Sequence, residues 1–310
     1  MEQQHAQHEA AIMHEGSAVA CAAAPRRVSA GERADRAASN AGEPCLEFAG
    51  STPYDDYVRT KTLHALQQPV TNHPAERAFL VNTQVMELYF GLLRTEWEHA
   101  QQQLRADNLD GTLAALARSV YHFEVLNASW RSLIWLTPAE FNDFRDALGE
   151  ASGFQSYAYR HVEFLLGLKE AARIRPHHGS PDIYADLNRA LNAPSLYDDA
   201  VALLARSGLG PSAPASPRSY ADEYHPDPAV EAAWSAIYAD PRATNPLFQL
   251  GEQLTEIADA FTTWRQRHLM AVKRAMGAKP GSGGSPGLTW LERSTRREVF
   301  PELWSARTAV

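Results

Sequence analysis

The sequence predicts an all-α protein, and two observations support that prediction. Apolar residues recur at steps of three or four over several long stretches, which is the period of an amphipathic helix. No stretch alternates apolar and polar residues over a convincing strand length, and no internal repeat is present. The Pro/Ser/Gly-rich segment 208–218 is the clearest loop. We therefore expect a single helical domain.

Composition narrows the class of protein. The 310 residues are 45% hydrophobic, which is ample for a packed core, and a formal net charge of −8 argues against nucleic acid as a partner. Cys21 and Cys45 both lie near the N-terminus and offer no disulfide framework. No apolar run reaches the ~18 residues of a membrane span, and the Glu/His/Gln-rich N-terminus does not predict a secretory signal. These features predict a cytoplasmic protein without membrane or nucleic-acid partners.

The N-terminal region differs in composition from the rest of the chain. Residues 1–46 are rich in Ala, Glu, Arg, Ser and Gly without a sustained period, which predicts a disordered or loosely helical arm. His5, His8 and His14 could chelate a metal weakly, but a solvated tail is the favoured interpretation. The helical domain is expected to occupy residues 47–310.

The first ordered elements precede a long helix. Tyr54 and Tyr57 lie one helical turn apart in a short run that Pro69 cannot continue. A long helix is predicted at 74–105, where Pro74 suits the first turn. Its apolar stripe comprises Phe79, Thr83, Met86 and Phe90.

Several shorter helices follow a second long one at 110–135. The sequence TPAE at 137–140 is a capping box with Pro at the first helical position, and it opens a short helix that Gly149 stops. In this helix Phe141 and Arg145 share a face, so the guanidinium could grip a carboxylate beside an aromatic ring. An ion pair with a neighbouring aspartate, Asp143 or Asp146, is equally compatible with the sequence. Further helical runs are expected at 154–172, 195–207 and 227–238.

The last long helix places a histidine on a face that should be buried. Gly277 ends this helix. Because His268 lies on the apolar stripe, it needs a partner, which could be a core hydrogen bond, a metal or the iron of a haem. The pattern alone favours a satisfied core histidine. The stripe comprises Leu250, Leu254, Ile257, Phe261, Trp264, His268 and Val272.

A glycine-rich loop, GSGGS, follows this helix at residues 281–285. It does not match a phosphate-binding loop, because it follows a helix and lacks the Gly-Lys-Ser/Thr ending. Taken alone, it is a mobile surface loop.

Several separated motifs together resemble the tryptophan 2,3-dioxygenase family, in the same order and over residues 54–307. They include WRQRH at 264–268, the glycine loop and FPELW at 300–304. They also include FRDALG at 144–149, SGFQS at 152–156 and EFLLG at 163–167. The resemblance implies an all-α fold with a haem pocket between helices.

The resemblance also implies roles for individual residues. His268 is expected to be the axial ligand of a b-type haem, flanked by Trp264 and by Ser152 and Gly153. The glycine loop becomes a lid, in which Ser282 replaces the family's usual Thr. Substrate-binding residues implied by the resemblance are Arg145 for the carboxylate, Ser282 in the lid, Phe79 and Phe141 around the indole, and Tyr54 and Tyr57 from a neighbouring subunit of a homotetramer.

Thr83 departs from the family pattern, because a distal histidine usually occupies its position. The Asp of a nearby His-Asp-Glu element is also missing, leaving HPAE at 73–76. A threonine hydroxyl can accept a hydrogen bond but cannot act as a base near neutral pH. Oxygen attack on an electron-rich indole does not obviously need a base, so ring cleavage stays possible.

The expected activity is oxidation of L-tryptophan or a close derivative by O2, with cleavage of C2–C3 to give N-formylkynurenine. Thr83 leaves open an alternative from the same superfamily, monooxygenation to a 2-oxindole with an external reductant. A remote alternative is a haem-binding sensor without catalytic activity. A sensor does not need Arg145 and Phe141 on one face beside a lid, so these residues argue against this alternative.

Overall fold

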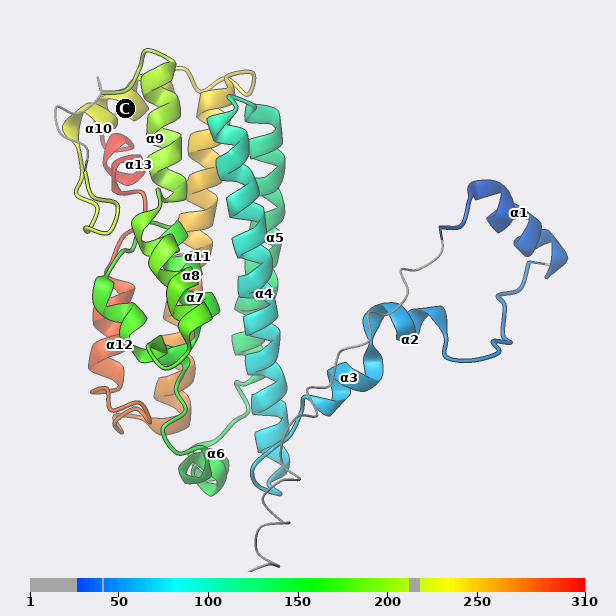
Figure 1. Cartoon of the computed structure of the whole chain (residues 1–310). Coiled ribbons are helices and arrows are strands. Elements are labelled where there is room, and N and C mark those ends of the chain that lie inside the picture. The colour runs from blue at the N-terminus through cyan, green and yellow to red at the C-terminus, as the bar shows by residue number, and fades with distance from the viewer. Residues whose placement is uncertain (1–26, 41, 212–217, 310) are drawn as a thin grey trace, which may run out of the picture. The chain divides into compact units, whose positions relative to one another are not determined.

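The computed structural model describes residues 27–40, 42–211 and 218–309. Throughout these ranges the regular elements are helices and no strand is present, which confirms the all-α prediction (Figure 1). The chain divides into two compact units, Met1–Gln68 and Pro69–Val310. None of the described helices is long and apolar enough to cross a membrane.

The described part of the first unit contains three short helices: α1 (Ala30–Ser39), α2 (Pro53–Val58) and α3 (Thr60–Ala65). The expected single run before Pro69 is split, because Arg59 adopts a left-handed conformation with φ of 57°. None of the three helices has a buried residue. The histidines at positions 5, 8 and 14 lie outside the described residues.

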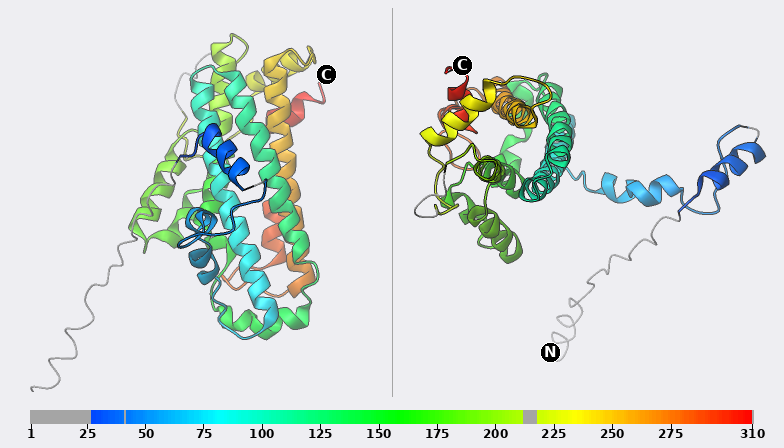
Figure 2. Two further views of the ribbon diagram at one scale, coloured as in Figure 1. Left: turned by 90° about the vertical axis from the view of Figure 1, so that its right-hand side faces the viewer. Right: turned by 90° about the horizontal axis from the view of Figure 1, so that it is seen from above.

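Three long helices form the second unit: α4 (Pro74–Arg105), α5 (Leu109–Ser132) and α11 (Pro246–Met276). They run side by side, with α5 packed against both α4 and α11 (Figures 1 and 2). Trp97, Phe123 and Phe261, one from each helix, are buried in successive ring contacts of 6.0 and 6.2 Å. Because a fully buried large apolar side chain contributes about 1.5–3 kcal/mol, each of these three rings stabilises the bundle.

Shorter helices cover the bundle, and their starts follow the sequence signals. Thr137 forms the predicted capping box of the first of them, and Ser195 forms another. The expected helix at 154–172 is wrong, because Ser156 caps a new helix and Gly167, with φ of 86°, ends that segment. The α-helices are α6 (Pro138–Arg145), α7 (Tyr157–Leu165), α8 (Pro181–Asn192), α9 (Leu196–Arg206), α10 (Pro228–Tyr238), α12 (Leu288–Thr295) and α13 (Pro301–Ala306), and the 3₁₀ helices are η1 (Asp146–Leu148), η2 (Gly153–Gln155) and η3 (Ala171–His177).

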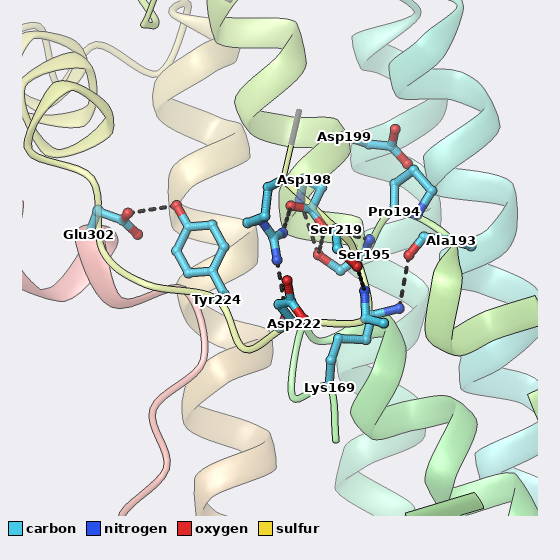
Figure 3. Close-up of polar contacts among 12 residues, drawn as sticks. Lys169, Ala193, Pro194, Ser195, Asp198, Asp199, Ser219, Asp222, Tyr224 and Glu302 are labelled. Atoms are coloured by element: carbon cyan, nitrogen blue, oxygen red, sulfur yellow. Dashed lines mark hydrogen bonds and ion pairs between the residues drawn. The ribbon is translucent and has the colours of Figure 1, made fainter. Parts of the chain in front are cut away.

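A buried carboxylate anchors the C-terminal helix α13. Glu302 is fully buried and accepts hydrogen bonds from the hydroxyls of Tyr197 and Tyr224, at 2.9 and 2.6 Å. The contact with Tyr224 is drawn in Figure 3. The backbone N–H of Asp227 donates to the same carboxylate at 2.8 Å. Because a buried carboxylate is costly unless its oxygens are hydrogen-bonded, these donors fix α13 against α9 and the start of α10.

Candidate active site

Aromatic side chains from α4 and α6 form an apolar wall. The ring of Phe79 lies 5.8 Å from that of Phe141 and 5.7 Å from that of Phe144, and the two α6 rings are 5.4 Å apart. Ala275 and Met276, at the end of α11, pack against the same cluster. The structure therefore brings together the two phenylalanines predicted from sequence. It adds Phe144, which stands one helical turn after Phe141 and could have been found from that spacing.

The ring of His268 packs against two indoles, which also contact each other. Its centroid is 4.6 Å from that of Trp130 with the planes 7° apart, and 5.5 Å from that of Trp264 at 48°. The imidazole is half-buried and forms no hydrogen bond with a described residue, so the core hydrogen bond favoured by the pattern alone is not found among them. Desolvation by the surrounding protein lowers the pKa of His268 to about 4.

This environment leaves His268 chemically available. With a pKa near 4, the imidazole is neutral at pH 7 and one ring nitrogen keeps a lone pair. The lone pair lies in the plane of the ring, so the indole of Trp130 against the ring face does not block it. A neutral histidine held in this way can ligate a metal.

Side-chain contacts show that α4 and α11, which both pack against α5, run in opposite directions. At one end, the ring of Phe90 meets that of Trp264 at 5.5 Å in an edge-to-face contact. At the other end, Phe79 belongs to the cluster that contains Met276. The facing stretches of the two helices therefore lie between these two contacts.

Thr83 and His268 occupy the facing stretches at similar heights. Thr83 precedes Phe90 by seven residues and His268 follows Trp264 by four, so a rise of ~1.5 Å per residue puts them about 5 Å apart along the axes. Thr83 is exposed, and its hydroxyl donates to the carbonyl of Phe79 at 2.9 Å. Because that bond uses only the hydroxyl hydrogen, the lone pairs of Thr83 remain free to accept.

Arg145 connects α6 to the start of the glycine loop. Its guanidinium donates to the carbonyl of Pro280. Arg145 forms no ion pair with Asp143, Asp146 or another described residue. Asp143 instead lies 3.5 Å from Nε2 of His73. The ion pair between Arg145 and a neighbouring aspartate, which the sequence left open, is therefore not found among the described residues.

The glycine loop packs against the segment that follows α6. The hydroxyl of Ser282 donates to the carbonyl of Ala151 at 2.6 Å. A Cβ atom on Gly283 would lie 2.9 Å from Cβ of Ser152, so glycine is needed for this close approach. Gly153, the next residue, begins η2 directly after its N-cap, Ser152. The loop therefore contacts residues 151 and 152 and is not a free surface loop.

The residues around His268 fit a prosthetic group that carries its own metal. The described part of the chain contains no cluster of three or more His, Cys, Asp or Glu side chains that could hold a metal ion. A single histidine is nevertheless sufficient for haem, because the porphyrin supplies the other ligands. The indole N–H groups of Trp130 and Trp264 are buried and have no acceptor among the described residues, so the neighbourhood of His268 has hydrogen-bond donors to offer.

Two residues predicted at the site belong to the first unit. Tyr54 and Tyr57 both lie on α2, where they are 68% and 77% exposed. The other residues predicted at the site are all in the second unit. Sequence reasoning also missed Trp130, whose place seven residues after Phe123 on the α5 stripe could have marked it as facing the core.

An all-α fold in which a neutral histidine lies among aromatic rings, without a hydrogen bond to a described residue, is compatible with a helical haem-binding protein. Comparison with known proteins is more specific, because the family model described as tryptophan 2,3-dioxygenase matches residues 39–206 and 192–310. The tryptophan 2,3-dioxygenase of Polaromonas sp. is 40% identical over 263 residues, covering 85% of this chain and 90% of its own length. That of Caulobacter vibrioides is 40% identical over 261 residues, covering 84% and 99%. The chain belongs to the tryptophan 2,3-dioxygenase family.

Proposed function

We propose that this protein is a haem-dependent oxygenase of the indole ring of L-tryptophan or a close derivative. The reaction inserts both atoms of O2 across the C2–C3 bond and gives N-formylkynurenine. The observation that carries the proposal is His268, which is neutral and has no hydrogen-bond partner among the described residues, on the helix whose C-terminal end meets the Phe79 and Phe141 wall. Membership of the family supports the same activity.

The chain's own residues would hold haem b. His268 would ligate the iron, with Trp264 beside it, and Ser152 and Gly153, in the segment that the glycine loop approaches, would contact the haem. When bound, the haem supplies the redox chemistry that O2 needs. The stack of Trp130 on His268 fixes the plane of the imidazole, the role that a hydrogen bond to the second ring nitrogen has in many metal sites.

The amino acid is positioned by charge, shape and one hydrogen bond. Arg145 binds the carboxylate, because a guanidinium offers paired donors that match its two oxygens. Ser282 in the loop adds a hydroxyl near the same end of the substrate. Phe79 and Phe141 offer apolar faces to the indole, and Thr83 accepts its N–H. The loop, held at residue 151, limits the access of water to this site.

We further infer that the active unit is a homotetramer in which neighbouring chains complete each other's sites. The helices α1 to α3 bury none of their residues, and the described segment from Leu46 to Leu66, which includes α2 and α3, carries exposed aromatic and aliphatic residues that need a covering surface. In this proposal the functional domain spans 47–310, and Tyr54 and Tyr57 reach the site of a neighbouring subunit. In the described part of the first unit, the exposed large apolar residues are Leu46, Phe48, Tyr54, Tyr57, Leu63 and Leu66.

Mass spectrometry of the product under ¹⁸O2 tests the reaction. The haem-loaded enzyme is incubated with L-tryptophan, with and without a reductant such as ascorbate. Ring cleavage adds two labelled atoms and yields N-formylkynurenine, whereas monooxygenation adds one and yields a 2-oxindole only when reductant is present. Thr83→His is expected to raise the share of N-formylkynurenine, because a distal imidazole can hold the indole N–H more firmly. An absence of substrate-dependent O2 uptake would reject both enzymes in favour of a sensor.

Mixed subunits test the shared site. Tyr57→Ala and Arg145→Ala proteins, each weakly active alone, are unfolded, mixed and refolded together. Hybrid assemblies then contain some sites with both native residues, so part of the activity should return. A fully active monomer by light scattering would contradict the shared site and leave the reaction itself untouched.

A further inference from the structure

A second pocket lies apart from the residues assigned to the active site. It has a volume of about 400 Å³, which is in the range of small-molecule sites. It opens between the segment after α7, the helix η3 and the helix α12. Its lining residues are Lys169, Glu170, Arg173, Glu223, Trp290, Arg293, Ser294 and Arg297.

The pocket is positive although the chain is acidic. Four cationic side chains and two carboxylates line it, a difference of +2, while the whole chain has a formal net charge of −8. Burial lowers the pKa of Lys169 to about 8, so this amine is still mainly charged at neutral pH. Its Nζ donates to the carbonyl of Ala193 at 2.9 Å (Figure 3). Lys169 therefore contributes charge, while direct contacts with a ligand fall to the arginines.

Two arginines keep donors available at this pocket. Nε of Arg173 donates to Glu170 at 2.8 Å, but its terminal nitrogens donate to no described residue. The terminal nitrogens of Arg297 lie 3.5 Å from Glu170 and 3.6 Å from Glu223, which is too long for good hydrogen bonds. Both guanidinium groups can therefore donate to an incoming acceptor, and a carboxylate matches their geometry.

An indole supplies the apolar wall of the pocket. The guanidinium of Arg173 lies over the ring of Trp290 at 5.2 Å and over that of Phe154 at 5.5 Å. Phe154 in turn meets Trp290 edge to face at 5.8 Å. These contacts hold the indole in place, so an aromatic ligand can pack on it at little cost in side-chain entropy.

We propose that this pocket binds a small planar aromatic carboxylate. Its ring packs on Trp290, and its carboxylate accepts hydrogen bonds from Arg173 and Arg297. The pocket selects an anion by its net charge and an aromatic body by its indole wall. None of its lining residues takes part in the proposed reaction, so a failure of this proposal would not affect the proposed function, and the reverse also holds.

Calorimetric titration of the haem-loaded enzyme with 2-naphthoate tests this site. An Arg145→Gln background weakens carboxylate binding at the active site. In that background, Arg297→Gln should weaken binding about tenfold or more, and Trp290→Leu several-fold. Trp290→Phe keeps an aromatic wall and should stay close to the parent. Arg296→Gln is the matched control, because it removes the same charge from an exposed neighbour that does not line this pocket.

Two further probes separate the chemical features of the ligand. Acetate carries the anion without the ring, and 2-naphthylmethanol carries the ring without the charge, so both should bind at least tenfold more weakly than 2-naphthoate. Equal binding by either probe would overturn the proposed ligand class. Binding of 2-naphthoate that Arg297→Gln changes no more than Arg296→Gln does would overturn the location, provided that thermal melts show both variants folded.

Discussion

Acidification of the haem-free protein should reveal the unusual environment of His268. Its pKa is lowered from 6.5 to about 4 by desolvation, so the folded protein keeps this imidazole neutral where the unfolded chain would protonate it. The contribution of His268 to stability is therefore complete above pH 6.5 and is lost progressively as the pH falls toward 4. Between about pH 7 and pH 5, this linkage removes about 2 kcal/mol of the free energy of unfolding.

Urea denaturation of wild type and His268→Gln at both pH values measures that loss. The variant lacks the titrating group, so its free energy of unfolding should fall by about 2 kcal/mol less than that of the wild type over this range. His225→Gln is the control, because it removes an exposed histidine of the same unit and should follow the wild type. If wild type and His268→Gln lose the same free energy, the imidazole is not desolvated, and the argument for a neutral, available ligand fails.

Two substitutions test how the substrate is held. Arg145→Ala removes charge-assisted hydrogen bonds worth about 1.5–3 kcal/mol, so kcat/KM for L-tryptophan should fall about 10- to 150-fold at unchanged haem content. Tryptamine lacks the carboxylate, so a smaller change for L-tryptophan than for tryptamine would contradict this role of Arg145. Gly283→Ala places a methyl group 2.9 Å from Cβ of Ser152, so steady-state turnover should fall several-fold while the melting temperature stays near wild type. Gly179→Ala, where nothing lies within 4 Å, is its control, and equal turnover of both variants would show that the contact of the loop with Ser152 is not needed.

The elements that the sequence predicted well are those with local start and stop signals. The helix from Pro74 to Arg105 and the capping box at Thr137 appear as expected, because their signals lie within one turn of the backbone they control. The prediction of one helix at 154–172 was wrong because local signals also break a helix. Ser156 is a good N-cap in the middle of an apolar run, and Gly167 takes a positive φ, so the chain breaks into separate segments. Periodicity alone could not show those breaks.

For the site too, local sequence patterns predicted some features, while others depend on contacts between distant parts of the chain. Resemblance supplied the residues with chemical roles, but it could not show what surrounds them. Trp130 reaches His268 from another helix, so no spacing along α11 could reveal that stack. The second pocket is invisible in the sequence because Lys169, Glu223 and Trp290 meet only after folding.

The structure also indicates how substrate binding and loop position are linked. Two side chains assigned to the substrate already contact the backbone at the loop, since one terminal nitrogen of the Arg145 guanidinium donates to the carbonyl of Pro280 and the hydroxyl of Ser282 donates to that of Ala151. Both partners are neutral backbone acceptors, whereas hydrogen bonds to a carboxylate are roughly twice as strong. A carboxylate in the site therefore competes well for Arg145 while leaving the second contact in place. In the proposed function, substrate binding would then release one end of the loop and keep the other attached, which allows the loop to adjust over the amino acid without leaving the site.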